Sequence, residues 1–374
     1  MHFHENLFRK KLLSWYEKNK KPHPWRLMWN QDRDPYPVWV SEILLQQTTL
    51  SAATPAFLRF LSTFPDPTSL AQAEELAVKQ VVQGLGYYRR FSFLKRAAEQ
   101  LSLKEKNKRI IWPQTYDEWK KLPGVGDYTA SAVSSIVLNL PEPSIDGNVE
   151  RVLSRLFDIR EPILPKTKAI FKEMSRGLIC RKCPGDYNQA MMEIGQTVCR
   201  VKSPSCDHCP LSSFCLAKER KSIHLAPSSK TMKPRQTLFL HLVIMQDGSR
   251  YGLVERPSSA KFLKGVTGFL TAIDPDCVSL EDSSDQRLYQ MDGRPELFCQ
   301  EFKRIGAFKH SITHHDLLVS VSLSSAQLWT VLSPVWLAPD DLEAKLVSSL
   351  DIKAWNLLRK SKEGRLVPLK RKNN

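Results

Sequence analysis

Four cysteines near the middle of the chain have a spacing that suits a metal centre: Cys199, Cys206, Cys209 and Cys215. Their C-x6-C-x2-C-x5-C run is too compact for disulfides and too irregular for an ordinary zinc finger, and it is what four thiolates need to surround one [4Fe–4S] cube. A structural zinc site is an alternative, because Cys180 and Cys183 add a second C-x2-C pair to that of Cys206 and Cys209. Unliganded core cysteines are another alternative, and spacing alone leaves all three open.

Two carboxylates have the settings of an acid–base pair. Glu42 lies in an apolar segment, residues 38–47, so burial should raise its pKa and keep it protonated near neutrality. Asp146 opens an Asp-Gly-Asn turn and is expected to cap a helix that starts near Asn148, which does not exclude a catalytic role. A raised-pKa acid paired with an ionised carboxylate is the arrangement that cleaves glycosidic bonds. The simpler interpretation of Glu42 places it on the polar edge of a core helix.

A Leu-Pro-Gly-Val-Gly turn lies between two predicted helices and contains Gly124, Val125 and Gly126. Two glycines around one apolar residue allow a tight hairpin, whose backbone N–H groups at the start of the second helix can bind a phosphate. That is the pattern of a helix-hairpin-helix DNA-binding element. A plain helix connection with a glycine C-cap fits the same residues equally well.

A second glycine turn, Gly84-Leu85-Gly86-Tyr87-Tyr88-Arg89-Arg90, places aromatic and cationic side chains together. Such a loop can wedge into a base stack while its arginines hold phosphate. The alternative is a helix break followed by two core tyrosines. DNA is therefore a candidate partner of both glycine turns.

The composition of the 374-residue chain also favours a polyanionic partner. Its net charge of +16 suits nucleic acid, because each neutralised phosphate releases a counterion, although excess charge can also serve solubility alone. No apolar run approaches a membrane span, and the first residues lack a signal-peptide layout. We therefore expect a cytoplasmic protein, nucleoid-associated if bacterial, whose eight cysteines are thiols or metal ligands.

The elements that must position these residues divide the chain in two. Residues 1–217 read as a succession of helices separated by Pro, Gly or Asn/Asp breaks. The expected helices lie at about 4–19, 38–50, 69–83, 88–101, 115–121, 127–139, 148–158, 166–178 and 186–198. Residues 218–236 are polar and rich in Pro, Ser and Lys, which indicates a linker.

Beyond the linker the period of the sequence changes. Two β-rich runs within 238–255 flank Asp247-Gly248, a hairpin signal, and 317–323 is a further strand. A helix is expected over 295–305. We therefore predict a mostly helical fold followed by a smaller α+β domain at 237–358 and a basic tail at 359–374.

The ordered set of motifs resembles one known family. Ser-Glu-Ile-Leu-Leu-Gln-Gln-Thr (41–48), Gly-Leu-Gly-Tyr-Tyr (84–88), Leu-Pro-Gly-Val-Gly-Asp-Tyr-Thr-Ala (122–130), Ile-Asp-Gly-Asn-Val (145–149) and Asn-Gln-Ala-Met-Met-Glu-Ile-Gly (188–195) precede the cysteine run. Together they resemble the adenine DNA glycosylases of the MutY family, within the helix-hairpin-helix glycosylases. The resemblance implies that residues 1–217 are the catalytic domain, that 199–215 is its [4Fe–4S] loop, and that Cys180 and Cys183 are unliganded.

The resemblance also implies roles for individual residues. The enzyme would excise adenine paired with 8-oxoguanine or guanine, with Glu42 protonating the adenine and Asp146 stabilising the oxocarbenium-like sugar. The adenine must first be flipped out of the duplex. Residues that match family positions for filling the vacated stack, lining the adenine pocket and contacting DNA are Gln47, Leu85, Tyr87, Arg26, Glu193, Asn148, Gly124, Val125 and Gly126. The partner would be double-stranded DNA bound by a monomer.

Tyr128 distinguishes this family from its nearest rival. The endonuclease III branch of pyrimidine glycosylase/lyases carries a lysine at this position as its Schiff-base nucleophile. A phenol cannot form that imine, so a monofunctional glycosylase is expected. A rival from another class is a non-catalytic DNA-binding protein whose iron–sulfur cluster serves as a redox sensor.

The second domain resembles the Nudix-like domain with which the family inspects 8-oxoguanine. Leu253-Val254-Glu255-Arg256-Pro257, followed by Gly265 and Gly268, resembles its start, without a hydrolytic carboxylate cluster. The family's Phe-Ser-His reading loop falls on Ile312-Thr313-His314, where the histidine matches and the phenylalanine is lost. His314 is therefore expected to contact the lesion, with a plain surface histidine as the alternative.

Overall fold

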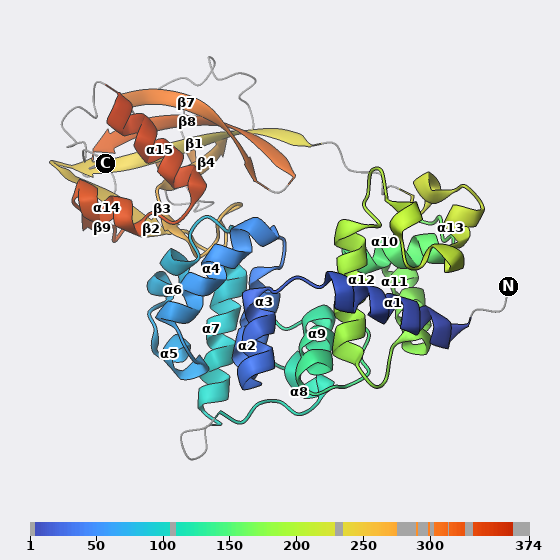
Figure 1. The fold of residues 1–374 in the computed structure, drawn as a ribbon. Coiled ribbons are helices and arrows are strands. Elements are labelled where there is room, and N and C mark those ends of the chain that lie inside the picture. The colour runs from blue at the N-terminus through green and yellow to red at the C-terminus, as the bar shows by residue number, and fades with distance from the viewer. Residues whose placement is uncertain are drawn as a thin grey trace, which may run out of the picture. The chain divides into compact units, whose positions relative to one another are not determined.

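The computed structural model describes residues 4–104, 110–228, 235–274, 289–290, 298–299, 303–312, 314–325 and 332–361 (Figure 1). The chain divides into two units, which are treated separately below. The first comprises residues 1–81 and 90–232, and the second comprises residues 82–89 and 233–374. Of the positions with a sequence prediction, Thr313, residues 229–234 of the linker and residues 362–374 of the basic tail lie outside the described residues.

The first unit is built from helices (Figure 1). They are α1 (Glu5–Asn19), α2 (Pro24–Asp32), α3 (Pro35–Leu44), α4 (Leu50–Thr63), α5 (Pro67–Gln72), α6 (Glu75–Val81), α7 (Arg89–Ser102), α8 (Tyr116–Lys120), α9 (Asp127–Val137), α10 (Gly147–Leu156), α11 (Pro165–Leu178), α12 (Pro184–Thr197) and α13 (Leu216–Glu219). Among the described residues, none of the helices has the length and apolar character needed to cross a membrane.

Local sequence explains where these helices begin. Proline occupies the first turn of α2, α3, α5, α11 and α12, where its missing N–H has no partner to lose. Side-chain oxygens cap other N-termini: Asp34 accepts from the Tyr36 amide, and Thr115 accepts from the Glu118 amide. Asp66 and Ser69 form a reciprocal capping box at α5.

Several helix predictions need correction. The expected helix at 69–83 is two helices, because Ala73 adopts an extended conformation at the end of α5. The expected helix at 38–50 starts at Pro35 and ends at Leu44, where a turn follows. Helices α2 and α4 were not predicted from the sequence. Each contains a proline, which usually interrupts a helix, but Pro24 starts α2 and Pro55 lies inside α4.

The core of the first unit surrounds α3 and α12. In α3 every residue after Pro35 is buried, and Trp39 packs edge-on or tilted against Trp112 and Trp119. A second cluster joins α1, α10, α11 and α12 and includes Phe8, Val152, Phe171 and Ile194. Both helices are therefore held in place by burial on several sides, which gives the polar residues they carry little freedom.

The second unit contains a mixed sheet with strand order β3-β2-β1-β8-β7. The central strand β1 (Gln236–Asp247) pairs antiparallel with β2 (Arg250–Glu255) and β4 (Leu270–Asp274), and parallel with β8 (His315–Ser325). β7 (Lys303–Ile312) pairs antiparallel with β8, while β3 (Thr267–Gly268) and β9 (Val335–Leu337) both pair with β2. A separate short pair joins β5 (Tyr289–Gln290) to β6 (Phe298–Cys299).

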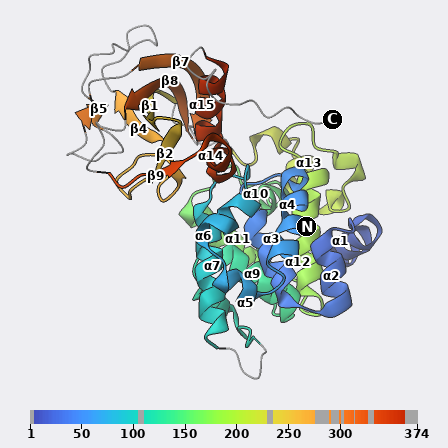
Figure 2. The ribbon, with the colours of Figure 1, turned by 90° about the vertical axis from the view of Figure 1, so that its left-hand side faces the viewer.

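Helices α14 (Pro339–Lys345) and α15 (Ser349–Lys360) lie beside this sheet (Figure 2). Trp355 of α15 is buried and meets Tyr251 of β2 edge to face. A fully buried ion pair, Arg256 with Asp351 at 2.6 Å, joins β2's end to α15. Asp351 also accepts a hydrogen bond from the Phe269 amide, so this buried carboxylate has several donors.

The strand predictions for this unit are confirmed in part. The hairpin around Asp247-Gly248 forms between β1 and β2, and the run at 317–323 lies within β8. The helix expected at 295–305 is wrong: β6 and the start of β7 occupy its described residues. Strand β7 pairs with β8, so tertiary pairing overrides the local helical signal.

Candidate active site

Glu42 is a buried carboxylic acid on α3. Its side chain is 8% exposed, and its Oε2 atom has no hydrogen-bond partner among the described residues. The pKa of Glu42 is raised to about 7 by the balance of four effects. Burial, the largest, raises it, a hydrogen bond from Tyr128 lowers it, the charge of Asp146 raises it, and the charge of Arg26 lowers it. The buried setting predicted from the sequence is confirmed, and Glu42 can exist as an acid or a carboxylate near neutrality.

Asp146 differs from Glu42 because its carboxylate accepts several hydrogen bonds. It caps α10: Oδ1 accepts hydrogen bonds from the backbone amides of Asn148 (3.0 Å) and Val149 (2.8 Å). Oδ2 accepts from the Asn148 side chain at 2.7 Å. The predicted capping role is confirmed, because the Asp146 side chain accepts from two backbone amides at the N-terminal end of α10.

Asn148 is held against α12. A Cβ atom at Gly195 would lie 2.6 Å from Cβ of Asn148, so α12 approaches α10 as closely as a glycine allows. Arg151, one turn along α10, donates to Oδ1 of Asn148 and to the carbonyls of Gly195 and Cys199. The position of Asp146 therefore depends on packing between two helices rather than on a free loop.

One cavity of about 370 Å³ brings together six of the predicted site residues. Glu42, Tyr128, Asp146, Asn148, Arg26 and Glu193 all line it. The sequence separates these residues widely, and the packing of α2, α3, α9, α10 and α12 brings them together. Its lining also includes Trp25, Leu45, Met192 and Gln196, which the motif analysis did not single out.

Arg26 and Glu193 form one wall of this cavity. Arg26 donates to Oε2 of Glu193 at 3.0 Å and to Oε1 of Gln189 at 2.7 Å. Its guanidinium also stands 5.4 Å from the ring centre of Tyr16, in cation–π range. The planar fork of an arginine held in this way presents a fixed positive surface to the cavity.

Tyr128 lies on α9, the helix that follows the glycine hairpin. Its hydroxyl donates a hydrogen bond to Sδ of Met192 at 3.1 Å. Burial raises the pKa of Tyr128 well above its ordinary value, and the charges of Glu42 and Asp146 and a hydrogen bond with Glu42 raise it further. The phenol is therefore neutral, a proton donor rather than a nucleophile.

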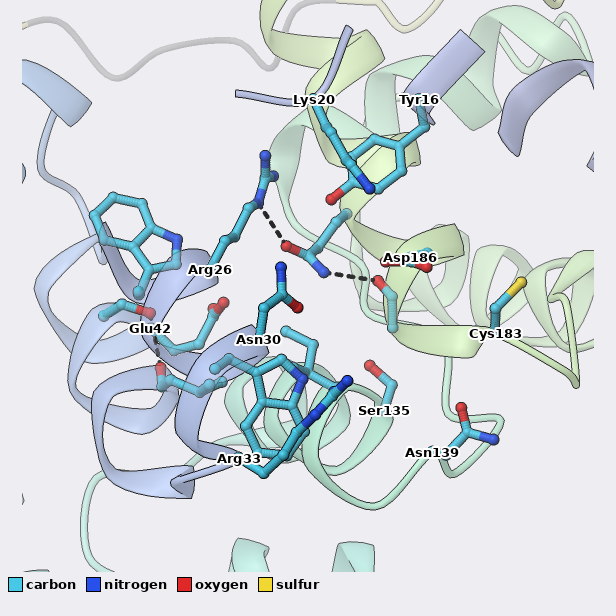
Figure 3. A pocket seen from close by; sticks show the side chains of 17 residues that line it. Tyr16, Lys20, Arg26, Asn30, Arg33, Glu42, Ser135, Asn139, Cys183 and Asp186 are labelled. Carbon is cyan, nitrogen blue, oxygen red and sulfur yellow. Dashed lines mark hydrogen bonds between the residues drawn. The ribbon is translucent and has the colours of Figure 1, made fainter. Parts of the chain in front are cut away.

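A neighbouring cavity of about 260 Å³ shares Glu42 and Arg26 with the first. Figure 3 shows Arg26, Asn30 and Glu42 on the blue helices facing Asp186 and Cys183 at the start of α12. Sequence reasoning missed this cavity because Tyr16, Asn30 and Ser135 belong to none of the motifs. The helical spacing of residues 26, 30 and 33 on one face was the signal that could have indicated it.

The remaining predicted residues lie elsewhere among the described residues. Gln47 follows α3 with a positive φ of 56°, and Tyr87 has a φ of 47° and a side chain that is 54% exposed. Leu85 belongs to the turn that precedes Tyr87. His314 is exposed in the turn between β7 and β8.

The hairpin turn joins α8 to α9 with tight backbone geometry. Gly124 has a φ of 77°, and a Cβ atom there would lie 2.6 Å from Cβ of Phe93, so glycine is required. Val125 is buried, and Gly126 is the extended N-cap residue of α9. The tight hairpin expected from the sequence is confirmed, with the start of α9 next to the turn.

The four cysteines of the central run line one small cavity together with Arg155 and Lys218. Arg155, which is buried, donates to Sγ of Cys199 at 3.3 Å and to the carbonyls of Arg200, Val201 and Ala226. Among the described residues, no three His, Cys, Asp or Glu side chains are close enough to hold one metal ion. Cys180 and Cys183 are not among the residues that line this cavity.

Comparison with known proteins identifies the family. Residues 40–178 match the model of the HhH-GPD superfamily of base excision DNA repair proteins. The adenine DNA glycosylase of Buchnera aphidicola subsp. Schizaphis graminum is 34% identical over 325 residues, which cover 85% of this chain and 88% of the relative. The chain belongs to the adenine DNA glycosylase family. The family predicted from the sequence is thus confirmed.

Other members of the family are longer. The Arabidopsis thaliana adenine DNA glycosylase is 32% identical over 362 residues, covering 85% of this chain and 57% of the relative. The Rattus norvegicus protein is 39% identical over 219 residues, and the match covers 42% of its length. The chain therefore spans about half the length of these curated relatives.

A solved structure confirms the fold of the helical part. A thermostable thymine-DNA glycosylase matches with a TM-score of 0.51 and 24% identity, over 58% of this chain and 97% of the other. The helical glycosylase fold with an additional sheet-containing unit is therefore the architecture of this family member.

Proposed function

We propose that the protein is a DNA repair glycosylase that excises adenine paired with 8-oxoguanine or guanine by hydrolysing its N-glycosidic bond. The observation that carries this proposal is one cavity holding a buried acid, Glu42 with a pKa of about 7, and a capped carboxylate, Asp146. Membership of the adenine DNA glycosylase family supports adenine as the base. The +16 net charge suits a DNA partner.

In the proposed reaction the two carboxylates act in different steps. Protonated Glu42 donates its proton to the flipped adenine, which becomes a better leaving group as the C1′–N9 bond breaks. Asp146 stabilises the positive charge that develops on the sugar, and water then completes hydrolysis. Each carboxylate is suited to its step by its surroundings, since Glu42 is desolvated and Asp146 accepts several hydrogen bonds.

The other cavity residues position the base. Arg26 and Glu193 offer donors and acceptors to the edge of an adenine, while Trp25 and Leu45 offer apolar surface. Tyr128 hydrogen-bonds Glu42 and, as a neutral phenol, provides no amine for a Schiff base. Gln47, Leu85 and Tyr87 would enter the vacated stack, and the exposed, positive-φ setting of Tyr87 is compatible with this role.

The glycine hairpin would hold the DNA backbone. Gly124 allows the turn, buried Val125 anchors it, and the amides at Gly126 and the start of α9 are available to a phosphate oxygen. Asn148 completes the site by fixing Asp146 rather than by contacting the base.

We propose that Cys199, Cys206, Cys209 and Cys215 hold a [4Fe–4S] cluster. Four thiols around one cavity suit a group in which each thiolate binds its own iron. Arg155 and Lys218 supply positive charge beside the thiolates. Electrons are not needed to break a glycosidic bond, so the cluster would hold the loop around Arg200 and Lys202 for contact with DNA.

We propose the domain boundaries that the sequence predicts. Residues 1–217 would be the catalytic domain, 218–236 the linker, 237–358 a Nudix-like domain that inspects 8-oxoguanine, and 359–374 a basic tail. The exposed turn at His314 supports a contact with the opposite base. The enzyme would act as a monomer on double-stranded DNA.

The proposal is tested by single-turnover excision from a duplex containing one A:8-oxoguanine pair, comparing wild type with Glu42→Gln. Wild type should release adenine, and the variant should be slower by about 10²–10⁴-fold. Equal, slow release by both proteins would contradict the assignment and favour a non-catalytic cluster protein. Efficient borohydride trapping on abasic DNA would instead favour an endonuclease III-like lyase.

A further inference from the structure

A pair of thiols outside the proposed cluster has the geometry of a dithiol. Cys180 follows α11, and Cys183 is the N-cap residue of α12. Their Sγ atoms are 2.9 Å apart, with Arg181 and Lys182 exposed between them. A disulfide bond is about 2.05 Å long, so a small side-chain movement would join the two sulfurs. Both thiols are partly exposed, which gives small reagents access.

The two thiols differ in their surroundings. Burial opposes ionisation of Cys180, but hydrogen bonds from the Cys183 side chain and from the amides of Cys183 and Lys182, together with Arg9, lower its pKa overall. Burial, the hydrogen bond to Cys180 and the charges of Cys180 and Asp186 raise the pKa of Cys183 to about 12. The lower pKa makes Cys180 the nucleophile of the pair, and Cys183 is the resolving thiol.

Arg9 has a fixed place in this arrangement. Its guanidinium donates to the carbonyls of Leu178 at 2.9 Å and Gly177 at 2.6 Å, at the end of α11. The positive charge is therefore held next to the segment that carries Cys180. Such an electropositive, partly exposed setting distinguishes reactive thiols from inert core cysteines.

We propose that Cys180 and Cys183 form a redox-active dithiol that small disulfides, such as glutathione disulfide, oxidise to an intramolecular disulfide. The Cys180 thiolate attacks one sulfur of glutathione disulfide and releases one glutathione thiolate. Cys183 then loses its proton to that leaving thiolate and attacks the mixed disulfide at Cys180 Sγ. The second glutathione leaves as a thiolate, so two protein thiols are oxidised and one glutathione disulfide is reduced to two thiols.

The site is separate from the proposed cluster. Cys199, Cys206, Cys209 and Cys215 line their own cavity, whereas Cys183 lines the cavity that includes Asp186, Gln189 and Glu42. The dithiol joins α11 to the start of α12, the helix that presents Gln189 and Glu193 to Arg26. The inference rests on these thiols alone and stands whether or not the protein excises adenine.

The test is peptide mapping of the native, cluster-loaded full chain after incubation with glutathione disulfide and blocking of free thiols. Trypsin cuts after Arg181 and Lys182, and a protease that cuts before Asp186 separates Cys183 from Cys199. The peptides 177–181 and 183–185 should then remain joined only in the oxidised sample, and dithiothreitol should release them. In a reduced sample, iodoacetamide should alkylate Cys180 about tenfold faster than Cys183.

Single variants identify the order of the steps. Cys183→Ser should accumulate glutathione on Cys180, because the resolving thiol is missing, while Cys180→Ser should accumulate little adduct on Cys183. Visible absorbance of the cluster should stay constant, since the cluster cysteines are not involved. The proposal is overturned if the linked peptide is absent from the native protein or forms only in urea. It is also overturned if the pair retains a bound metal ion that must be chelated before oxidation.

Discussion

The guanidinium of Arg26 lies 3.0 Å from the carboxylate of Glu193 and joins α2 to α12 across the wall of the cavity that holds Glu42. The two side chains are 17% and 6% exposed, so water screens the pair only weakly. The same positive charge lowers the pKa of Glu42 against the larger effect of burial. One arginine therefore shapes both the cavity and the acidity of its buried acid.

Replacing this arginine tests that dual role. Arg26→Met should reduce single-turnover excision about 10–100-fold, because a fixed donor is lost and the carboxylate of Glu193 is left unpaired. Arg33→Met is the matched control, since Arg33 stacks on Trp29 and lines only the neighbouring cavity. A loss of similar size in the control would contradict a specific role for Arg26.

The pH dependence of excision should report Glu42. Only the protonated acid can donate to the base, so the single-turnover rate should fall about tenfold per pH unit above pH 7. Tyr128→Phe removes a hydrogen bond that lowers the pKa of Glu42, so the fall should begin at higher pH in that variant. Rates that stay constant up to pH 9 in wild type would exclude Glu42 as the proton donor.

Stability should depend on protonation of the same group and should also fall as the pH rises. The folded-state pKa of Glu42, about 7, exceeds the ordinary 4.5, so the folded state binds the proton more tightly and loses stability as the pH rises through this interval. At pH 8 Glu42→Gln should exceed wild type by roughly 3 kcal/mol in urea unfolding, and at pH 4 the difference should vanish.

Glu150 supplies the control for this measurement. It is similarly buried but forms an ion pair with Lys168 at 2.7 Å, so Glu150→Gln should bring no gain in stability at pH 8. A gain as large as that of Glu42→Gln would mean that net charge, rather than an unpaired buried acid, governs the change.

Two substitutions at Asp146 should separate capping from catalysis. Asn is as good an N-cap as Asp, so Asp146→Asn should change the free energy of unfolding by less than about 0.5 kcal/mol while excision falls at least about 10²-fold. Asp146→Ala should lose the cap as well and cost about 1 kcal/mol in stability. Thermal unfolding and excision assays on the same samples would show whether the two effects part in this way.

Arg155 should control the cysteine loop. Arg155→Met removes hydrogen bonds to Sγ of Cys199 and to three loop carbonyls, so we expect lost cluster absorbance and unfolding easier by about 2–4 kcal/mol. The nearby Arg160 makes an exposed ion pair with Asp158, and Arg160→Met should retain the cluster. Equal cluster contents in the two variants would refute the role of Arg155.

Some features of the candidate site could be predicted from the local sequence, and others could not. The burial of Glu42 and the capping by Asp146 follow from neighbouring residues alone, because an apolar run and an Asp-Gly-Asn turn are local signals. The neighbourhood of Arg26, Glu193 and Tyr128 depends on packing of distant helices, which only the family resemblance could anticipate. Neither source indicated the second cavity or the short distance between Cys180 and Cys183, since Tyr16, Asn30 and Ser135 belong to no motif and the C-x2-C spacing was also compatible with zinc.

The fold shows the same division. Periodicity located the strands of the Asp247-Gly248 hairpin but misassigned 295–305, where long-range pairing with β8 decides the structure. Helices α2 and α4 could not be predicted because of their prolines. A proline at a helix start or inside a helix gives the same sequence signal as a proline that ends one.

The contact between Gly195 and Asn148 has a consequence for variation within the family. Because a methyl group at position 195 would overlap the side chain at position 148, neither position can drift independently of the other. A homologue that keeps Glu42 and Asp146 but carries a larger residue at position 195 should therefore place Asn148, and with it Asp146, differently. The close crossing of α10 and α12 is thus a criterion for whether a homologue can form the same site.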